Sequence, residues 1–331
     1  MIIYFDTVKR KRPVKDAGEL IKLDWASKKI LRTVPVYPCD PDIEDDPNPR
    51  GNSRGGKGIF ISGTDLFVGT YHSILVFDLD LNFQRKITNN LFVNIHEMCL
   101  DGQNIWVSST AVDAALLVDR KGSILKSFWP REERLLQEKY GLCPMNIDKN
   151  IDNRLAHLSV EASTKAHHTH LNSVVKSGGN TYVLLSSLGA IVQIEPEVKL
   201  ALEDSFIRGA HSPVISREGD RLLLCSSLRK SIVVYDLISG KLMKHIDLLD
   251  FAEISDLNQA HPGQPFSQSI FVRGLEMIDA RRVLVGIAPV SILEIDVSLN
   301  RLLDIFHYSE NVGDAVHGLV HLSPAGMPPS F

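Results

Sequence analysis

The sequence repeats one pattern along most of its length, and this repeat constrains the fold more than any other feature. Each copy has a polar leading residue, an apolar run, a turn with Gly, Asp or Asn, a second apolar run that ends in small residues, and a third that ends near Asp. Short β-branched runs bounded by turn residues are typical of strands rather than helices. The copies begin at Lys57, His96, His170, His211, Arg273 and His317, and the last one is partial.

The spacing of the leading residues predicts a β-propeller. Three intervals, 39 (57 to 96), 41 (170 to 211) and 44 (273 to 317), fit one four-stranded blade, and two longer ones, 74 (96 to 170) and 62 (211 to 273), require insertions. The last copy supplies one strand, and residues 2–5, 19–25 and 29–34 offer three more. We therefore predict an all-β, six-bladed β-propeller that forms a single domain over residues 1–331. Pairing the N-terminal strands with the C-terminal strand closes the ring and removes its exposed sheet edges.

Three long segments, 36–57, 129–169 and 250–272, lie between the outermost strand of one blade and the innermost strand of the next. In a propeller these connections emerge on one face, around the mouth of the central tunnel. Since long loops in compact domains are often functional, we expect a lid, a docking place for a protein partner, or a decorated rim. We expect one short helix over 131–140, with Pro130 at its first position and Gly141 at its end.

Composition excludes several classes of protein. The 36 Lys and Arg residues against 40 Asp and Glu residues give a net charge of -4, which provides no general attraction to nucleic acid or to an anionic membrane. The four cysteines form no CxxC pair, and the basic cluster near the N-terminus follows its apolar run, the reverse of a signal peptide. GxSxG, GxGxxG and HExxH motifs are absent from the sequence. We expect a cytoplasmic protein whose ligand is a small anionic organic molecule.

The leading residues are the candidate site, because the start of each innermost strand reaches the tunnel axis. Imidazole ligates metals through a neutral nitrogen, and guanidinium offers a fixed fork to an anion. In the first hypothesis, His96, His170, His211 and His317 bind one divalent transition metal, such as iron, manganese or zinc, and Arg273 anchors the substrate of an oxidoreductase or lyase.

Two other hypotheses need no metal. In one, the histidines act as general acid and base or as a nucleophile beside Arg273, as in lyases and in sulfuryl or phosphoryl transfer. His168 is a candidate catalytic residue, since it could serve beside His170 as a proton shuttle or as a second ligand, and Asn172 is a candidate for orienting a substrate carbonyl. In the other, the polar residues hydrogen-bond between blades, and the protein is a non-catalytic ligand-binding or protein-binding propeller. The role of Glu97, next to His96, stays open.

A glycine-rich basic stretch over residues 50–58 is a further candidate for anion binding. Arg54 and Lys57 supply positive charge there, and the glycines expose backbone N–H groups. The stretch lacks the GK[ST] ending of a P-loop, because Gly58 follows Lys57 and a strand is expected next.

The order of these phrases resembles a family of uncharacterised bacterial six-bladed propellers, distantly similar to NHL-type propellers. The resemblance is carried by His96-Glu97-Met98 before Trp106-Val107-Ser108-Ser109, His170-Leu171-Asn172 before Tyr182-Val183, His211-Ser212-Pro213 before Leu222-Leu223-Leu224, and Phe271-Val272-Arg273-Gly274-Leu275 before Val285-Gly286. It spans residues 54 to about 297. It implies the fold and a pocket at the tunnel, and no particular reaction.

Overall fold

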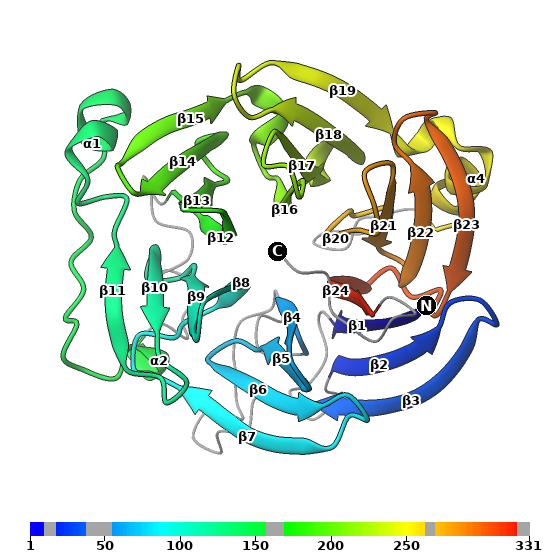
Figure 1. Ribbon diagram of the computed structural model, residues 1–331, viewed down its shortest axis with the longest axis horizontal. Coiled ribbons are helices and arrows are strands. Elements are labelled where there is room, and N and C mark those ends of the chain that lie inside the picture. Colours follow the sequence, from blue (N-terminus) through cyan, green and yellow to red (C-terminus); the bar gives the residue numbers. More distant parts are fainter. Residues whose placement is uncertain (10–17, 38–54, 157–168, 262–268, 323–331) are drawn as a thin grey trace.

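The chain forms six four-stranded antiparallel sheets arranged as blades around a common centre (Figure 1). This computed structural model describes residues 1–9, 18–37, 55–156, 169–261 and 269–322. The predicted all-β six-bladed propeller is confirmed.

Each blade runs from an inner strand near the centre to an outer strand at the rim. Blade 1 contains β24 (Asp314–Leu322), β1 (Ile2–Lys9), β2 (Gly18–Asp24) and β3 (Lys29–Val36). Blade 2 contains β4 (Ile59–Ser62), β5 (Asp65–Gly69), β6 (Ser73–Asp78) and β7 (Phe83–Thr88), and blade 3 contains β8 (Ile95–Asp101), β9 (Asn104–Ser109), β10 (Ala114–Val118) and β11 (Ile124–Phe128). Blade 4 contains β12 (Leu171–Ser177), β13 (Asn180–Leu185), β14 (Ala190–Glu195) and β15 (Lys199–Glu203). Blade 5 contains β16 (His211–Ile215), β17 (Arg221–Ser226), β18 (Ser231–Asp236) and β19 (Leu242–Asp247), and blade 6 contains β20 (Gly274–Met277), β21 (Arg282–Ile287), β22 (Ser291–Asp296) and β23 (Arg301–His307).

Blade 1 closes the ring by joining the two ends of the described chain, as predicted. Strand β24 pairs antiparallel with β1, so that Ile3 lies opposite His321 and Phe5 opposite Leu319. A side-chain hydrogen bond connects blade 1 to blade 6: the indole Nε1 of Trp25 donates to the Glu294 carboxylate over 2.7 Å.

The hydrophobic core is divided into six clusters, one at each boundary between neighbouring blades. Successive residues of a strand point to opposite faces of its sheet. Val107 therefore packs toward blade 2, whereas its neighbour Trp106 packs toward blade 4. The middle strands are buried on both faces, which explains why they read as continuous apolar runs. The outer strands expose most of their residues.

The three insertions lie where the sequence predicts, between an outer strand and the next inner strand. The predicted helix is present as α1 (Arg134–Tyr140), and Gly141 ends it with a left-handed φ of 65°. Pro130 is not its first residue, because residues 129–133 form turns that precede the helix. Two further helices, α2 (Asn153–Ala156) and α4 (Ala252–Ala260), were not predicted, since neither sequence carries a strong capping pattern.

Part of the second insertion docks beside the start of blade 3. The Asn90 side chain donates to the carbonyls of Lys149 and Ile151, and the backbone N–H of Asn153 donates to the carbonyl of Asn90. These bonds hold residues 149–153 against the connection that leads into β8.

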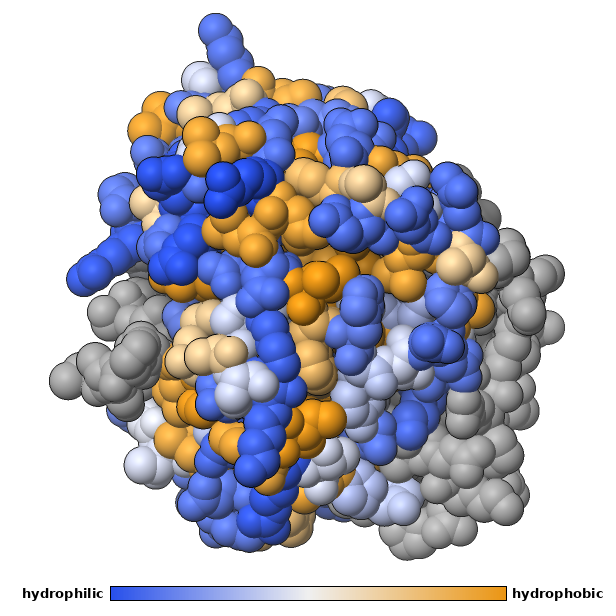
Figure 2. Space-filling model, turned by 90° about the vertical axis from the view of Figure 1, so that its right-hand side faces the viewer, coloured by the Kyte–Doolittle hydropathy of each residue, from blue (hydrophilic) through white to orange (hydrophobic). Residues whose placement is uncertain are grey.

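On the side of the molecule that faces the viewer in Figure 2, hydrophobic and hydrophilic residues are interspersed. The exposed apolar residues belong mainly to outer strands and turns, as with Ile30, Phe83 and Met243. Within the described ranges, none of the helices has the length and hydropathy needed to cross a membrane.

Candidate functional site

Bulges shape the inner strands near the residues that the repeat singles out. The register shifts between Ile95 and Met98 in β8, between Leu171 and Ser173 in β12, and between His211 and Val214 in β16. A bulge increases the local twist and re-aims the side chains beside it. The starts of the inner strands also lie nearest the centre of the ring (Figure 1).

Four imidazole rings from four blades come together there. The ring centroid of His96 lies 5.6 Å from that of His170, 5.6 Å from that of His317 and 6.3 Å from that of His211. The rings of His211 and His317 are 6.3 Å apart. The structure thus brings together four residues that are far apart in sequence. With Lys57 and Arg273, they are called the axial group below.

His170 reaches the axial group from a different backbone position than the sequence predicts. The residue just before the bulge pairs with the last residue of the second strand in both blades, Ile95 with Ser109 and Leu171 with Leu185. The counterpart of His96 in blade 4 is therefore Asn172, and the predicted equivalence of His96 and His170 is wrong. His170 precedes β12 and has a left-handed φ of 53°. Its extra reach toward the axis comes from this conformation, which the sequence does not reveal.

Backbone carbonyls fix the tautomers of two histidines. Nδ1 of His96 lies 3.1 Å from the carbonyl oxygen of Asn94, and Nδ1 of His317 lies 3.1 Å from that of Lys57. A carbonyl only accepts, so each Nδ1 carries a proton. In the neutral rings, Nε2 then has a lone pair. Nε2 of His317 is buried and has no hydrogen-bond partner among the described residues.

His211 has the same tautomer for a less direct reason. Its Nδ1 lies 2.8 Å from the hydroxyl of Ser227, and that hydroxyl also contacts the carbonyl oxygen of Val272. The hydroxyl has one proton, which the carbonyl must receive. Ser227 therefore accepts from Nδ1 of His211, and Nε2 again has a lone pair when the ring is neutral.

Two cations make the axial group electropositive. Lys57 is buried, contacts the side-chain oxygen of Asn94 and lies 5.4 Å from the ring centroid of Tyr71. The guanidinium of Arg273 stacks over Phe271, with 4.6 Å from its central carbon to the ring centroid. Arg273 is half-buried, so it forms part of the accessible rim of the group.

Burial and these cations keep His96 and His317 neutral. Burial is the main reason that the pKa of His96 lies well below its ordinary value, and the charge on Lys57 lowers it further. Burial also depresses the pKa of His317, followed by the charge on Arg273 and then that on Lys57. Both rings are therefore neutral bases near pH 7.

Two buried carboxyl groups lie beside the axial group. Burial raises the pKa of Glu97 to about 8, and its Oε1 lies 3.8 Å from Nδ1 of His317. The Ser212 hydroxyl lies 2.8 Å from Oε1 of Glu97 and also contacts the carbonyl oxygen of Arg273. The hydroxyl donates to Oε1, and this bond partly offsets the effect of burial on the pKa of Glu97.

The second carboxyl group is that of Asp6, whose pKa burial raises well above its ordinary range. Oδ1 accepts from the backbone N–H of Gly318 over 2.8 Å, and Oδ2 is buried without a hydrogen-bond partner among the described residues. Burial therefore favours the neutral form of both acids, while the charge of Lys57 lowers the pKa of Asp6 and the charge of Arg273 lowers that of Glu97.

The remaining predicted site residues have different outcomes. Asn172 donates to the carbonyl of Ala210 over 3.0 Å, so its amide links blade 4 to blade 5, and its buried Oδ1 has no hydrogen-bond partner among the described residues. Arg54 and His168 lie outside the described residues. The sequence analysis missed Asp6, Asn94, Ser212 and Ser227. A weak signal exists only for Asn94, which lies two residues before His96.

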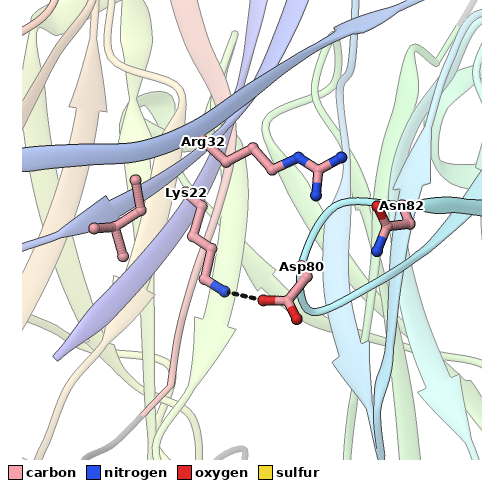
Figure 3. A pocket seen from close by; sticks show the side chains of 5 residues that line it. Lys22, Arg32, Asp80 and Asn82 are labelled. Atoms are coloured by element: carbon pink, nitrogen blue, oxygen red, sulfur yellow. Dashed lines mark hydrogen bonds and ion pairs between the residues drawn. The ribbon is translucent and has the colours of Figure 1, made fainter.

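The described residues contain no group of three or more His, Cys, Asp or Glu side chains arranged to hold a metal ion. A separate surface hollow lies at the rim, between blades 1 and 2 (Figure 3). The ion pair between Lys22 and Asp80, 2.7 Å long, spans it. Leu31, Arg32 and Asn82 complete its lining.

Comparison with known proteins agrees on the fold. No protein-family model matches the chain, and no curated protein matches it in sequence. A crystal structure of a protein of unknown function from Bacteroides caccae superposes with a TM-score of 0.56 at 13% identity, covering 96% of this chain and 97% of that one. A chain of a nidogen/laminin complex gives 0.55 at 10% identity, with 96% of each chain covered.

Virginiamycin B lyase from Staphylococcus aureus matches less well, with a TM-score of 0.45, 11% identity, and coverage of 81% of this chain and 71% of that one. At their low identities, the first two comparisons support the fold alone. Because no family model matches the chain, its resemblance to the bacterial propeller family stays a prediction.

Proposed function

We propose that the chain binds a small anionic organic molecule at the axial group and acts on it by acid–base chemistry of the lyase type. The observation that carries the proposal is the state of His317, a neutral buried imidazole whose Nε2 has a lone pair and no partner among the described residues. A buried polar atom of this kind needs a ligand or an ordered water. A neutral imidazole with a lone pair can accept a proton.

Charge supports an anionic ligand. Lys57 and Arg273 both act on the histidine pKa values, so their positive field extends across the axial group. Burial raises the pKa values of Glu97 and Asp6, which favours their neutral forms and reduces the negative charge beside the two cations. A carboxylate suits the planar fork of the Arg273 guanidinium, and the Lys57 ammonium adds a point charge.

In the proposed step, the two cations hold the carboxylate of the ligand. Nε2 of His317 takes a proton from the adjacent carbon, the C–H bonding pair becomes a carbon–carbon double bond, and a leaving group on the next carbon departs with its own bonding pair. The resulting imidazolium lies beside Glu97, whose Oε1 is 3.8 Å from Nδ1.

A divalent metal is the second candidate, because one observation favours it. Nδ1 of His96, His211 and His317 each donates to a protein oxygen, which is how metal-binding histidines are usually oriented. Two nearby cations oppose this candidate, since they repel a divalent ion. We therefore rank it below the anion site.

The test begins with ligand binding to the full chain. Malonate, other small carboxylates and sulfate should raise the melting temperature of the wild type, and Arg273→Ala should abolish the effect. Arg229→Ala is the matched control, because Arg229 stacks on Phe206 at 4.3 Å and is exposed. Unchanged stabilisation in Arg273→Ala would overturn the anion site.

The chemical step needs a second variant. His317→Gln should still bind carboxylates but should lose proton abstraction, measured as deuterium uptake or elimination in D2O, whereas His307→Gln at the rim should keep it. Binding without turnover in the wild type would favour a non-catalytic propeller. Elemental analysis should find no stoichiometric transition metal, and a metal lost in His96→Gln plus His211→Gln would favour the metal candidate instead.

A further inference from the structure

His170 has an unusual backbone for a residue that brings a side chain to the axis. Its φ of 53° is left-handed, a region that glycine and asparagine adopt more readily than most residues. The two residues on either side, Thr169 and Leu171, are fully buried. Something must hold this conformation, because an unrestrained histidine would favour another.

One carboxylate, that of Asp113, holds both flanking residues. The backbone N–H of Thr169 donates to Oδ2 of Asp113 over 3.0 Å, and that of Leu171 donates to Oδ1 over 3.1 Å. The hydroxyl of Thr169 donates to Oδ1 over 2.7 Å. These are buried, charge-assisted bonds, which are stronger than neutral ones. They fix the peptide units on both sides of His170.

The same turn of blade 3 also binds the carbonyls that follow. Thr110 Oγ1 donates to the carbonyl of Leu171 over 2.8 Å. Ser108 Oγ, in β9, lies 2.9 Å from the carbonyl oxygen of Glu97 and 3.2 Å from that of Asn172, so these two oxygens share its single proton. Ser108, Thr110 and Asp113 of blade 3 therefore form hydrogen bonds with the backbone N–H and carbonyl groups of residues 169–172. It thereby joins blade 3 to the start of β12 through the backbone on both sides of His170.

The start of blade 5 lacks this arrangement, and blade 3 has a different residue at the position of His170. The residues at the backbone position of His170 are Asn94 in blade 3 and, continuing the register of β16 by one step, Gly209 in blade 5. Both are left-handed, with φ of 58° and 70°, and both are residue types that tolerate it. The turn positions that correspond to Asp113 are Gly189 and Lys230 in the next two blades. At the starts of blades 4 and 5, the carboxylate of Asp113 therefore accompanies His170, whereas Gly189 accompanies Gly209.

We infer that Asp113 is a positioning residue for the axial group: by binding the peptide units around His170, it holds the His170 ring beside His96, where it contributes to ligand binding. The contribution to ligand binding rests on the proposed function, whereas the placement of the ring does not. Asp113 acts through the backbone of its neighbours and needs no contact with the ligand.

Ring placement is measured first, by NMR on protein labelled at histidine. The wild type should show a nuclear Overhauser effect between the ring protons of His96 and His170, whose centroids are 5.6 Å apart. Asp113→Asn should lose it, because the amide cannot accept from all three donors equally. Asp119→Asn should retain it, since Asp119 also accepts two backbone N–H groups but lies in the outer β10–β11 turn. Thr169→Val, which removes only the hydroxyl bond, should weaken it if Asp113→Asn does not fold.

Ligand binding is measured second, as a double-mutant cycle with malonate. Asp113→Asn should weaken binding about tenfold, the cost of one charge-assisted contact, and should have no additional effect in a His170→Ala background. An intact Overhauser effect in a folded Asp113→Asn variant would overturn the inference. If Asp113→Asn does not fold, an intact effect in Thr169→Val would overturn it. So would equal losses of affinity with and without His170. Loss of the Overhauser effect with no malonate binding in the wild type would contradict the proposed function and leave the positioning role supported.

Discussion

The imidazole of His317 donates its Nδ1 proton to the backbone carbonyl of Lys57 over 3.1 Å, across the junction between blade 1 and blade 2. The two residues are 260 positions apart in sequence. The bond requires the ring to close, because His317 belongs to the C-terminal strand of blade 1 and Lys57 precedes the first strand of blade 2. Closure of the propeller therefore also sets the protonation site of the proposed base.

Replacing Glu97 with Gln should remove one source of pH dependence in stability. The pKa of Glu97 is raised to about 8 from an unfolded value of 4.5, so the folded state holds the proton more tightly. Its contribution is fully present below pH 4.5 and is lost as pH rises toward 8, at about 1.4 kcal/mol per pH unit. Urea unfolding from pH 5 to 8 should show a shallower decline in Glu97→Gln than in the wild type. The exposed control Glu218→Gln should keep the full decline, and identical curves for Glu97→Gln and the wild type would refute the assignment.

Adding a methyl group at Gly318 should destabilise the junction beside the axial group. A Cβ there would lie 2.4 Å from the carbonyl oxygen of Lys57 and 2.6 Å from Oδ2 of Asp6. Because backbone and a buried carboxyl group block the space, Gly318→Ala should lower the free energy of unfolding by about 2 kcal/mol or more. Gly179→Ala is the control, since no atom lies within 4 Å of a Cβ there. Equal stability of the two variants would contradict the close packing around Asp6.

Removing the charge of Lys57 should make its histidine neighbours easier to protonate. Burial is the largest cause of the low pKa of His96, and the charge on Lys57 is the next. Lys57→Met should therefore raise the His96 pKa toward its ordinary value, and an NMR pH titration can follow the ring. The exposed variant Lys121→Met should leave the titration unchanged. A His96 pKa that stays fixed in Lys57→Met would show that the ammonium lies too far from the ring to act.

The repeat predicts the fold well because each blade has the same physical requirement. Two apolar faces alternate along the middle strands, as with Trp106 and Val107, and each face must pack against a neighbouring blade. The partial copy at His317 and the spare N-terminal strands leave one way to close the ring. The helix α4 carries no comparable constraint in the sequence and was missed.

The candidate site is predicted only in part, since its residue types are visible and its backbone geometry is not. A bulge and a left-handed residue shift the register, so aligning His170 with His96 by residue type chose the wrong counterpart. The contact between Ser212 and Glu97 joins residues 115 positions apart, and that between Gly318 and Asp6 joins residues 312 apart. Such pairs follow from the assembled ring and leave no local pattern.

The protonation state of His317 tests the proposed chemistry most directly. Nitrogen-15 NMR of histidine-labelled protein, with His317 assigned through His317→Gln, reports which ring nitrogen carries the proton. We predict a neutral ring at pH 7 with the proton on Nδ1, which stays neutral well below pH 6.5 because its pKa is depressed. An imidazolium at pH 7, or a proton on Nε2, would contradict the assignment of His317 as the base.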